Sequence, residues 1–165
     1  MTRDPWRAVL EEAESLRARA ALSLNIPPIP VPFEEPDEAL GDLAFGCFVY
    51  AKRMQQSPDA IASRLAPAIP RGRFIASATA TGGYVNLRVD PVVLASETLR
   101  ALRETGEAYG AGDPRAERVL LEHTSVNPTG PIHVGRARNP IIGDSLARIL
   151  RKAGLPLTTE YLVND

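Results

Sequence analysis

Apolar and polar positions along the first part of the chain follow a helical period. The apolar side chains of the first segment recur three or four residues apart: Trp6, Val9, Leu10, Ala13 and Leu16. Asp4 and Pro5 precede them as a capping acid and a first-turn proline, so this pattern predicts a helix. The stretch Ala39–Met54 is apolar nearly all round and predicts a second helix, buried on most sides. Between them, Ile26–Pro36 holds five prolines, which favours a rigid extended linker over a polyproline ligand.

The period changes from helical to alternating in the middle of the chain. Ser57-Pro58-Asp59 is a strong helix start, with a capping hydroxyl, a proline and an acid. Arg73–Thr81 and Tyr84–Val89 then predict two strands joined by a hairpin turn at Gly82-Gly83. One face of the second strand carries Val85, Leu87 and Val89, and the other carries Tyr84, Asn86 and Arg88. Asp90-Pro91 opens another helix, with one apolar face made by Val92, Ala95, Leu99 and Leu102.

The glycine-rich segment Gly106–Pro114 predicts a boundary, with residues 1–112 in one domain and 113–165 in the next. The elements expected behind it are a strand at Val119–His123, a loop at Asn127–Gly130, a helix from about Gly135 to Ala153 and a strand at Leu157–Val163. Pro140 predicts a kink or an irregular first turn in that helix. The fold class is therefore an α+β domain, with helices packed on a small antiparallel sheet, followed by one βαβ unit of an α/β domain. Two strands and one helix cannot cover a parallel sheet, so we expect either a fragment or docking on something else.

Composition and charge narrow the function classes. The 165 residues are 44% apolar and 24% charged, which is typical of a globular protein. Because the net charge is only −1, RNA binding would depend on local clusters such as Arg71, Arg73 and Arg88. Cys47 is the single cysteine and has no partner for an intramolecular disulfide. The charged start is unlike a signal peptide, and no apolar run approaches the length of a membrane span, so we expect a cytoplasmic protein.

The segment from Glu122 to Arg136 carries the candidate chemistry. A strand ends, a Gly/Pro loop follows, and a helix begins with His133 and Arg136 at its start. Helix N-termini present unpaired N–H groups and partial positive charge, which suit phosphate. Gly135 lacks a side chain where a nucleotide could approach the backbone. The loop also follows the carboxyl end of a strand, where open α/β sheets bind ligands.

His133-Val-Gly-Arg136 resembles the HIGH signature of class I aminoacyl-tRNA synthetases, and the flanks Ser125–Gly135, Ala137–Asn139, Ile142–Asp144 and Glu160–Asp165 resemble arginyl-tRNA synthetases. The resemblance implies a Rossmann-like catalytic domain in which His133 and Gly135 hold ATP. It also implies that Glu122, Ser125 and Asn127 hold the α-amino end of arginine. Magnesium is expected with ATP, although no ligand for it is identified. Arg136 stands where the family motif usually has His; a guanidinium could grip phosphate with two donors and tighten ground-state binding.

The earlier residues resemble the extra N-terminal domain of arginyl-tRNA synthetases, on Leu40–Ala44, Ser57–Ala62 and Ala80–Leu87. The resemblance implies that this domain binds the D-loop of tRNA(Arg). Tyr84 would stack on an unpaired base while Asn86 reads its edge; alternatively, both side chains lie on a solvated sheet face. We therefore expect a fragment of an arginine–tRNA ligase, inactive alone. The alternatives are a stand-alone module that binds the tRNA elbow and a different nucleotidyl-transfer enzyme with the same loop.

Overall fold

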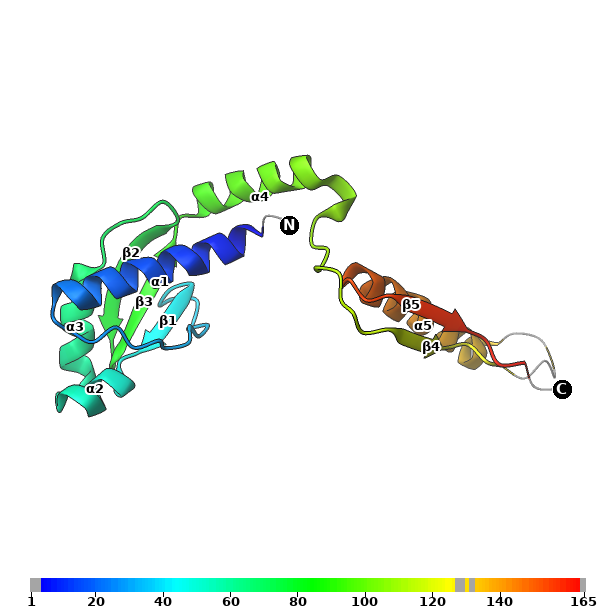
Figure 1. Cartoon of the computed structure of the whole chain (residues 1–165), viewed down its shortest axis with the longest axis horizontal. Coiled ribbons are helices and arrows are strands. Elements are labelled where there is room, and N and C mark those ends of the chain that lie inside the picture. Colours follow the sequence, from blue (N-terminus) through cyan, green and yellow to red (C-terminus); the bar gives the residue numbers. More distant parts are fainter. Residues whose placement is uncertain (1–3, 127–129, 131–132, 164–165) are drawn as a thin grey trace. The chain divides into compact units, whose positions relative to one another are not determined.

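The computed structural model describes residues 4–126, 130 and 133–163, so Asn127 lies outside the described residues. The chain divides into two compact units between Glu104 and Thr105 (Figure 1). The predicted domain boundary between residues 112 and 113 stays a prediction. None of the helices in the described ranges combines the length and the apolar character that crossing a bilayer requires.

The first unit contains helices packed on a small antiparallel sheet (Figure 1). Its elements are α1 (Pro5–Ser23), β1 (Leu43–Gly46), α2 (Phe48–Met54), α3 (Pro58–Ala68), β2 (Ile75–Thr81), β3 (Tyr84–Val89) and α4 (Pro91–Thr105). The strand order is β1-β3-β2, so β3 lies in the centre and pairs antiparallel on both sides. Helix α3 packs on β2 and β3, and α1 packs on α3 and β2.

The predicted helix starts and hairpin of this unit are confirmed. Asp4 Oδ1 accepts from the Trp6 N–H at 3.0 Å, and Ser57 Oγ accepts from the Ala60 N–H at 3.2 Å. Gly82 and Gly83 have φ values of +57° and +81°, which residues other than glycine rarely adopt. The second strand has the predicted bounds, whereas the first begins at Ile75 and not at Arg73.

The predicted helix Ala39–Met54 is wrong over its first half. Leu43–Gly46 forms β1 and pairs with β3 from Leu43↔Leu87 to Gly46↔Tyr84, and helix begins only at Phe48. All four strand residues are buried, so their apolar run has no polar positions to reveal its period. A short apolar run fits a buried strand as well as a buried helix, and the sheet decides between them.

A buried arginine lies within the apolar core of the first unit. Arg17 is only 2% exposed, and its guanidinium carbon lies 5.2 Å from the Phe33 ring centroid and 5.3 Å from that of Phe45. The guanidinium donates to the Val31 carbonyl and pairs with Glu14. A charge so deeply buried needs such partners. Burial also raises the pKa of the nearby Cys47 thiol to about 11, against the opposing effect of the Arg17 charge, so the thiol stays neutral at physiological pH.

Glu12 of α1 joins the first helix to the start of β2. Its carboxylate accepts three backbone N–H groups, from Arg73 at 2.7 Å, Phe74 at 2.6 Å and Ile75 at 2.9 Å. A Cβ at Gly72 would lie 2.6 Å from the carboxylate, so glycine at this position lets the Glu12 side chain reach these N–H groups without shifting. The bonds span more than 60 residues of sequence and fix the helix across the sheet.

Helix α4 presents a different face from the predicted one. Asp90 caps α4 by accepting hydrogen bonds from the Val92 and Val93 N–H groups. These bonds lower the pKa of the Asp90 carboxyl, and the bond from Val93 has the larger effect. Val93 and Leu94 pack against the core, which turns the predicted apolar face outward. Val92 is 73% exposed and Leu99 55% exposed.

The second unit is a short parallel strand–helix–strand arrangement. After the 3-10 turn η1 (Gly106–Ala108) come β4 (Val119–Glu122), α5 (Val134–Lys152) and β5 (Leu157–Glu160). Strands β4 and β5 pair in parallel from Val119↔Leu157 to Glu122↔Glu160. Helix α5 continues through Pro140. The second strand is shorter than the predicted Leu157–Val163, and large apolar side chains such as Leu120 and Ile141 remain more than 60% exposed.

Candidate functional site

Two of the three residues predicted to hold arginine lie together at the carboxyl end of β4. Glu122 is the last residue of that strand, and the Ser125 hydroxyl donates to its Oε1 at 2.8 Å. Ser125 Oγ also accepts from the Leu162 N–H at 3.2 Å, beyond the end of β5. Both residues line a hollow of about 370 Å³, whose walls are Leu121, Glu122, His123, Thr124, Ser125, Asn139, Ile142, Gly143 and Leu146.

The backbone between these two residues adopts a rare conformation. Thr124 has φ +75° and Ser125 has φ +35°. The Ser125 N–H donates to the His123 carbonyl at 3.0 Å, which closes a three-residue turn around Thr124. A positive φ is unfavourable for a β-branched residue, and this kind of tight turn is strained. Strained backbone of this sort is concentrated at functional sites.

His123 also lines the hollow, although no motif in the sequence marks it. Its Nδ1 lies 2.9 Å from Thr124 Oγ1, and its ring packs on the backbone of α5 at Gly143, where a Cβ would overlap the imidazole. Sequence reasoning missed this residue. The available signal was Gly143, a residue that weakens a helix interior unless close approach requires it.

His133 and Gly135 lie together at the start of α5. His133 is the exposed residue that precedes the helix, and its carbonyl accepts from the Arg136 and Ala137 N–H groups at 2.8 and 3.0 Å. Its imidazole lies against Gly135, because a Cβ there would be 3.1 Å from His133 Cε1. The glycine therefore leaves room for the imidazole ring.

Arg136 turns toward the loop that precedes α5. Its Nη1 donates to the Gly130 carbonyl at 3.1 Å, so the guanidinium holds the end of the loop near the helix start. The residues lining the hollow beside Glu122 do not include His133 or Arg136. The described part of the chain thus shows two separate pairs, Glu122 with Ser125 and His133 with Gly135. It holds no cluster of three or more His, Cys, Asp or Glu side chains suited to a metal ion.

The two residues predicted to read RNA share a small cavity in the first unit. Asn86, on the central strand β3, is only 3% exposed, and its Nδ2 finds no hydrogen-bond partner among the described residues. Tyr84 is half-buried, and its ring meets the Phe48 ring edge-on with centroids 5.2 Å apart. The cavity, of about 180 Å³, is lined by Glu34, Glu35, Pro36, Asp37, Leu40, Ala44, Thr81, Tyr84 and Asn86.

The alternative that Asn86 lies on a solvated sheet face is wrong. The chain around Glu34–Leu40 lies over this part of the sheet, and Glu34 bridges to Ala44 of β1 through backbone bonds of 2.8 and 2.9 Å. Three acids of this segment, Glu34, Glu35 and Asp37, were missed as lining residues. The acidic run that follows the prolines was the available signal.

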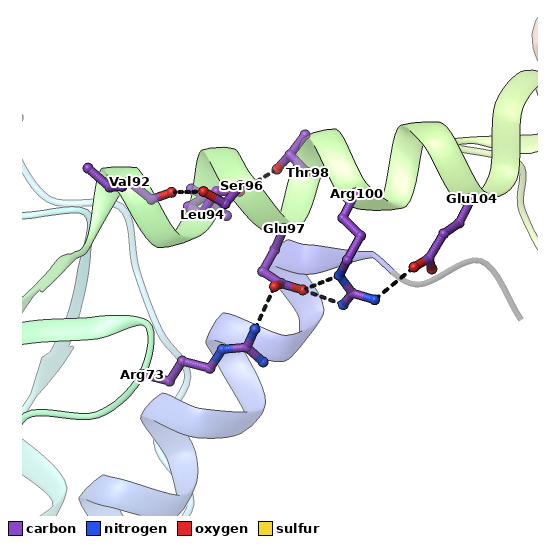
Figure 2. Close-up of polar contacts among 8 residues, drawn as sticks. All are labelled: Arg73, Val92, Leu94, Ser96, Glu97, Thr98, Arg100 and Glu104. Carbon is purple, nitrogen blue, oxygen red and sulfur yellow. Dashed lines mark hydrogen bonds and ion pairs between the residues drawn. The ribbon is translucent and has the colours of Figure 1, made fainter.

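The three arginines expected to meet phosphate are engaged within the first unit. Arg71 pairs with Asp90 at 3.2 Å, and Arg88 donates to the carbonyls of Glu38 and Ala39. Figure 2 shows Arg73 reaching Glu97 on α4, which also binds Arg100. All three arginine side chains are exposed at the surface and belong to structural contacts, so they are not a free basic patch.

Comparison with known proteins gives one consistent family. Residues 8–89 match the family model described as the arginyl tRNA synthetase N terminal domain. The arginine–tRNA ligase of Methanosarcina acetivorans is 43% identical over 160 residues, which cover 91% of this chain and 28% of the relative. That of Methanothermobacter thermautotrophicus is 41% identical over 145 residues, covering 87% and 25%.

Solved structures agree with the sequence matches. The arginyl-tRNA synthetase of Thermus thermophilus has a TM-score of 0.52 and 33% identity, over 94% of this chain and 25% of that one. The Plasmodium falciparum enzyme, at 15% identity and a TM-score of 0.58, shares the fold. The chain thus spans about a quarter of the length of the curated relatives it matches. It belongs to the arginyl-tRNA synthetase family and corresponds to the amino-terminal part of such a protein.

Proposed function

We propose that the protein is an arginine–tRNA ligase that activates arginine with ATP and transfers it to tRNA(Arg). The observation that carries this proposal is the Glu122–Ser125 pair beside a hollow at the carboxyl end of a parallel strand. A carboxylate with a neighbouring hydroxyl accepts hydrogen bonds from an ammonium group. Asn127 would add a third acceptor from the loop.

The start of α5 suits the triphosphate of ATP. His133 is exposed at a helix N-terminus, where N–H groups and the helix dipole favour phosphate oxygens. The imidazole would add a donor as charge builds in the transition state. Arg136 would contribute by keeping Gly130 near the helix start. Magnesium would accompany ATP, and we assign no residue to it.

The second unit fits the beginning of a Rossmann-like catalytic domain. Two adjacent parallel strands joined by a crossover helix are its repeating unit. The large apolar side chains that this unit exposes, Leu120 and Ile141 among them, support further elements packing on it, because extensive exposed apolar surface usually marks an interaction site.

Arginine-dependent ATP–pyrophosphate exchange by the full-length protein tests this function. We expect exchange with arginine and none above background with lysine, since the guanidinium and ammonium differ in shape and hydrogen bonding. Exchange that proceeds equally with lysine, or that needs no amino acid, would contradict the assignment and favour another nucleotidyl-transfer enzyme.

The cavity around Asn86 fits an unpaired base of the tRNA D-loop. An amide N–H without a partner is costly when buried, so its retention favours a ligand that supplies an acceptor. The acids Glu34, Glu35 and Asp37 repel phosphate but can accept from the N–H groups of a base edge. Tyr84 offers an aromatic face for stacking.

Replacing Tyr84 and Asn86 together by Ala is expected to weaken tRNA(Arg) binding about 10- to 100-fold at fixed salt, the usual size of a lost base-stacking contact. Filter binding or fluorescence anisotropy measures the affinity. Ser77→Ala is the matched control, because Ser77 is exposed on β2 and does not line the cavity. Equal affinity for both variants and the parent protein would end this assignment.

A second candidate function is a stand-alone module that binds the tRNA elbow. It is favoured by one observation: every residue that lines the Asn86 cavity belongs to the first unit, so this site needs nothing from the second. Exchange activity of the full-length protein separates this candidate from the ligase.

A further inference from the structure

We propose that His123, Thr124 and Gly143 are positioning residues that set the arginine-binding geometry of Glu122 and Ser125. The inference rests on the proposed ligase function and assigns a role to three residues outside the HIGH-like motif. Its basis is the strained turn at Thr124 and the contacts that hold it.

The turn at Thr124 decides where the Ser125 hydroxyl points. Strand β4 ends at Glu122, and the His123 N–H still donates to Glu160 at 3.2 Å, so the ladder with β5 continues to His123. The chain then reverses around Thr124 within three residues. This reversal brings Ser125 Oγ to 2.8 Å from the carboxylate of Glu122, three positions back. In an extended strand, residues three apart point to opposite faces and lie about 10 Å apart. The pair therefore exists only because the turn exists.

Strain at Thr124 must be opposed by contacts elsewhere. The His123 ring supplies two of them: its Nδ1 lies 2.9 Å from Thr124 Oγ1, and its carbons pack on Gly143 of α5. Gly143 is buried in α5, and a methyl group there would displace the imidazole. The ring thus forms a wedge between the helix and the turn. The contact with Gly143 of α5 fixes the position of the imidazole ring, and the contact of the ring with Thr124 holds the turn.

The far side of the turn is held by the segment after β5. The Leu162 N–H donates to Ser125 Oγ at 3.2 Å, and the Tyr161 hydroxyl donates to the Val126 carbonyl at 3.0 Å. With its hydrogen given to Glu122 and one acceptor position used by Leu162, Ser125 keeps one acceptor position for a ligand. The α-ammonium group of arginine would lie between this lone pair and the Glu122 carboxylate and donate a hydrogen bond to each of them.

The test is pyrophosphate exchange by full-length His123→Ala, His123→Asn and Gly143→Ala variants. We expect His123→Ala and Gly143→Ala to raise KM for arginine about tenfold, the size of one misplaced hydrogen bond to a charged group, with kcat and KM for ATP within about twofold. Asn can place a polar atom near the position of Nδ1, so His123→Asn should restore most of the arginine affinity. The double variant His123→Ala/Gly143→Ala should be no worse than His123→Ala, because the added methyl then fills space that the ring has left.

Thr124→Gly guards against an outcome caused by poor folding. Glycine adopts positive φ without strain, but it lacks the Oγ1 that lies 2.9 Å from His123 Nδ1 and is free to leave the turn, so KM for arginine should rise while the unfolding temperature changes little. An unchanged KM in Thr124→Gly and His123→Ala would overturn the inference and leave the ligase function intact. Additive effects of His123→Ala and Gly143→Ala would overturn the wedge. Absence of arginine-dependent exchange in the unaltered protein would overturn the proposed function, and the positioning role with it.

Discussion

Replacing His133 by Ala in the full-length protein is expected to slow arginine-dependent pyrophosphate exchange by about 10²- to 10³-fold, the usual loss when one preorganised donor is removed. His133 is exposed at the mouth of α5, and its ring lies against Gly135 and takes no part in the core. The change should therefore leave folding intact. The loss should fall on kcat more than on KM for ATP, because an interaction that strengthens with developing charge acts in the transition state.

Val134→Ala is the matched control for this variant. Val134 is the next residue and is 90% exposed within this unit, so its truncation removes no donor and no packing contact among the described residues. The control should keep its rate within about twofold, as surface substitutions generally have small effects. A His133→Ala enzyme that retains a rate similar to the control would remove the imidazole from the chemistry of this site.

Replacing Phe45 by Ala is expected to destabilise the first unit by about 3–5 kcal/mol, through lost burial and the cavity left behind. Phe45 is fully buried in β1, and its ring meets Phe33 edge-on with centroids 6.0 Å apart. The ring also packs under the buried guanidinium of Arg17, which would lose one of its two aromatic neighbours. Because a domain is stable by only about 5–15 kcal/mol, this single change removes a large share.

Urea denaturation followed by tryptophan fluorescence measures this loss. Trp6 is the one tryptophan among these 165 residues and lies in α1, so for the 165-residue chain the signal reports the first unit. Phe48→Ala is the control with the same chemistry, since Phe48 is 49% exposed. Phe48→Ala should lower the free energy of unfolding much less than Phe45→Ala does. Similar midpoints for the two variants would contradict the core position of Phe45.

The sequence predicted those parts of the fold whose signals are local. The caps at Asp4 and Ser57 and the Gly82-Gly83 turn depend on a few adjacent residues, and each is present. Strand β1 was read as helix because its residues are buried on both sides and lack a period. The outward face of α4 was also predicted wrongly, because Val93 and Leu94, and not Val92 and Leu99, pack against the core.

The site was predictable to the extent that a family motif marks it. The motif marked Glu122, Ser125 and His133 as candidate site residues, and the structure shows where each of them lies. Their roles stay predictions. The sequence did not mark His123 as a site residue, because no motif surrounds it and the glycine that its ring contacts lies twenty residues away. The buried state of Asn86 was missed because the segment Glu34–Leu40, about 50 residues away in sequence, lines the same cavity.

The bonds between Glu12 and the start of β2 also limit the order of folding. Helix α1 is synthesised first, yet the backbone groups that its carboxylate accepts are made 61 to 63 residues later. In proteins most of a helix's stability comes from packing of its apolar face, and the apolar stripe of α1 has no partner until α3 and then β2 emerge. During translation the apolar side chains of α1 therefore stay exposed at least until α3 has been made, and this is the interval in which chaperone binding would have its greatest effect.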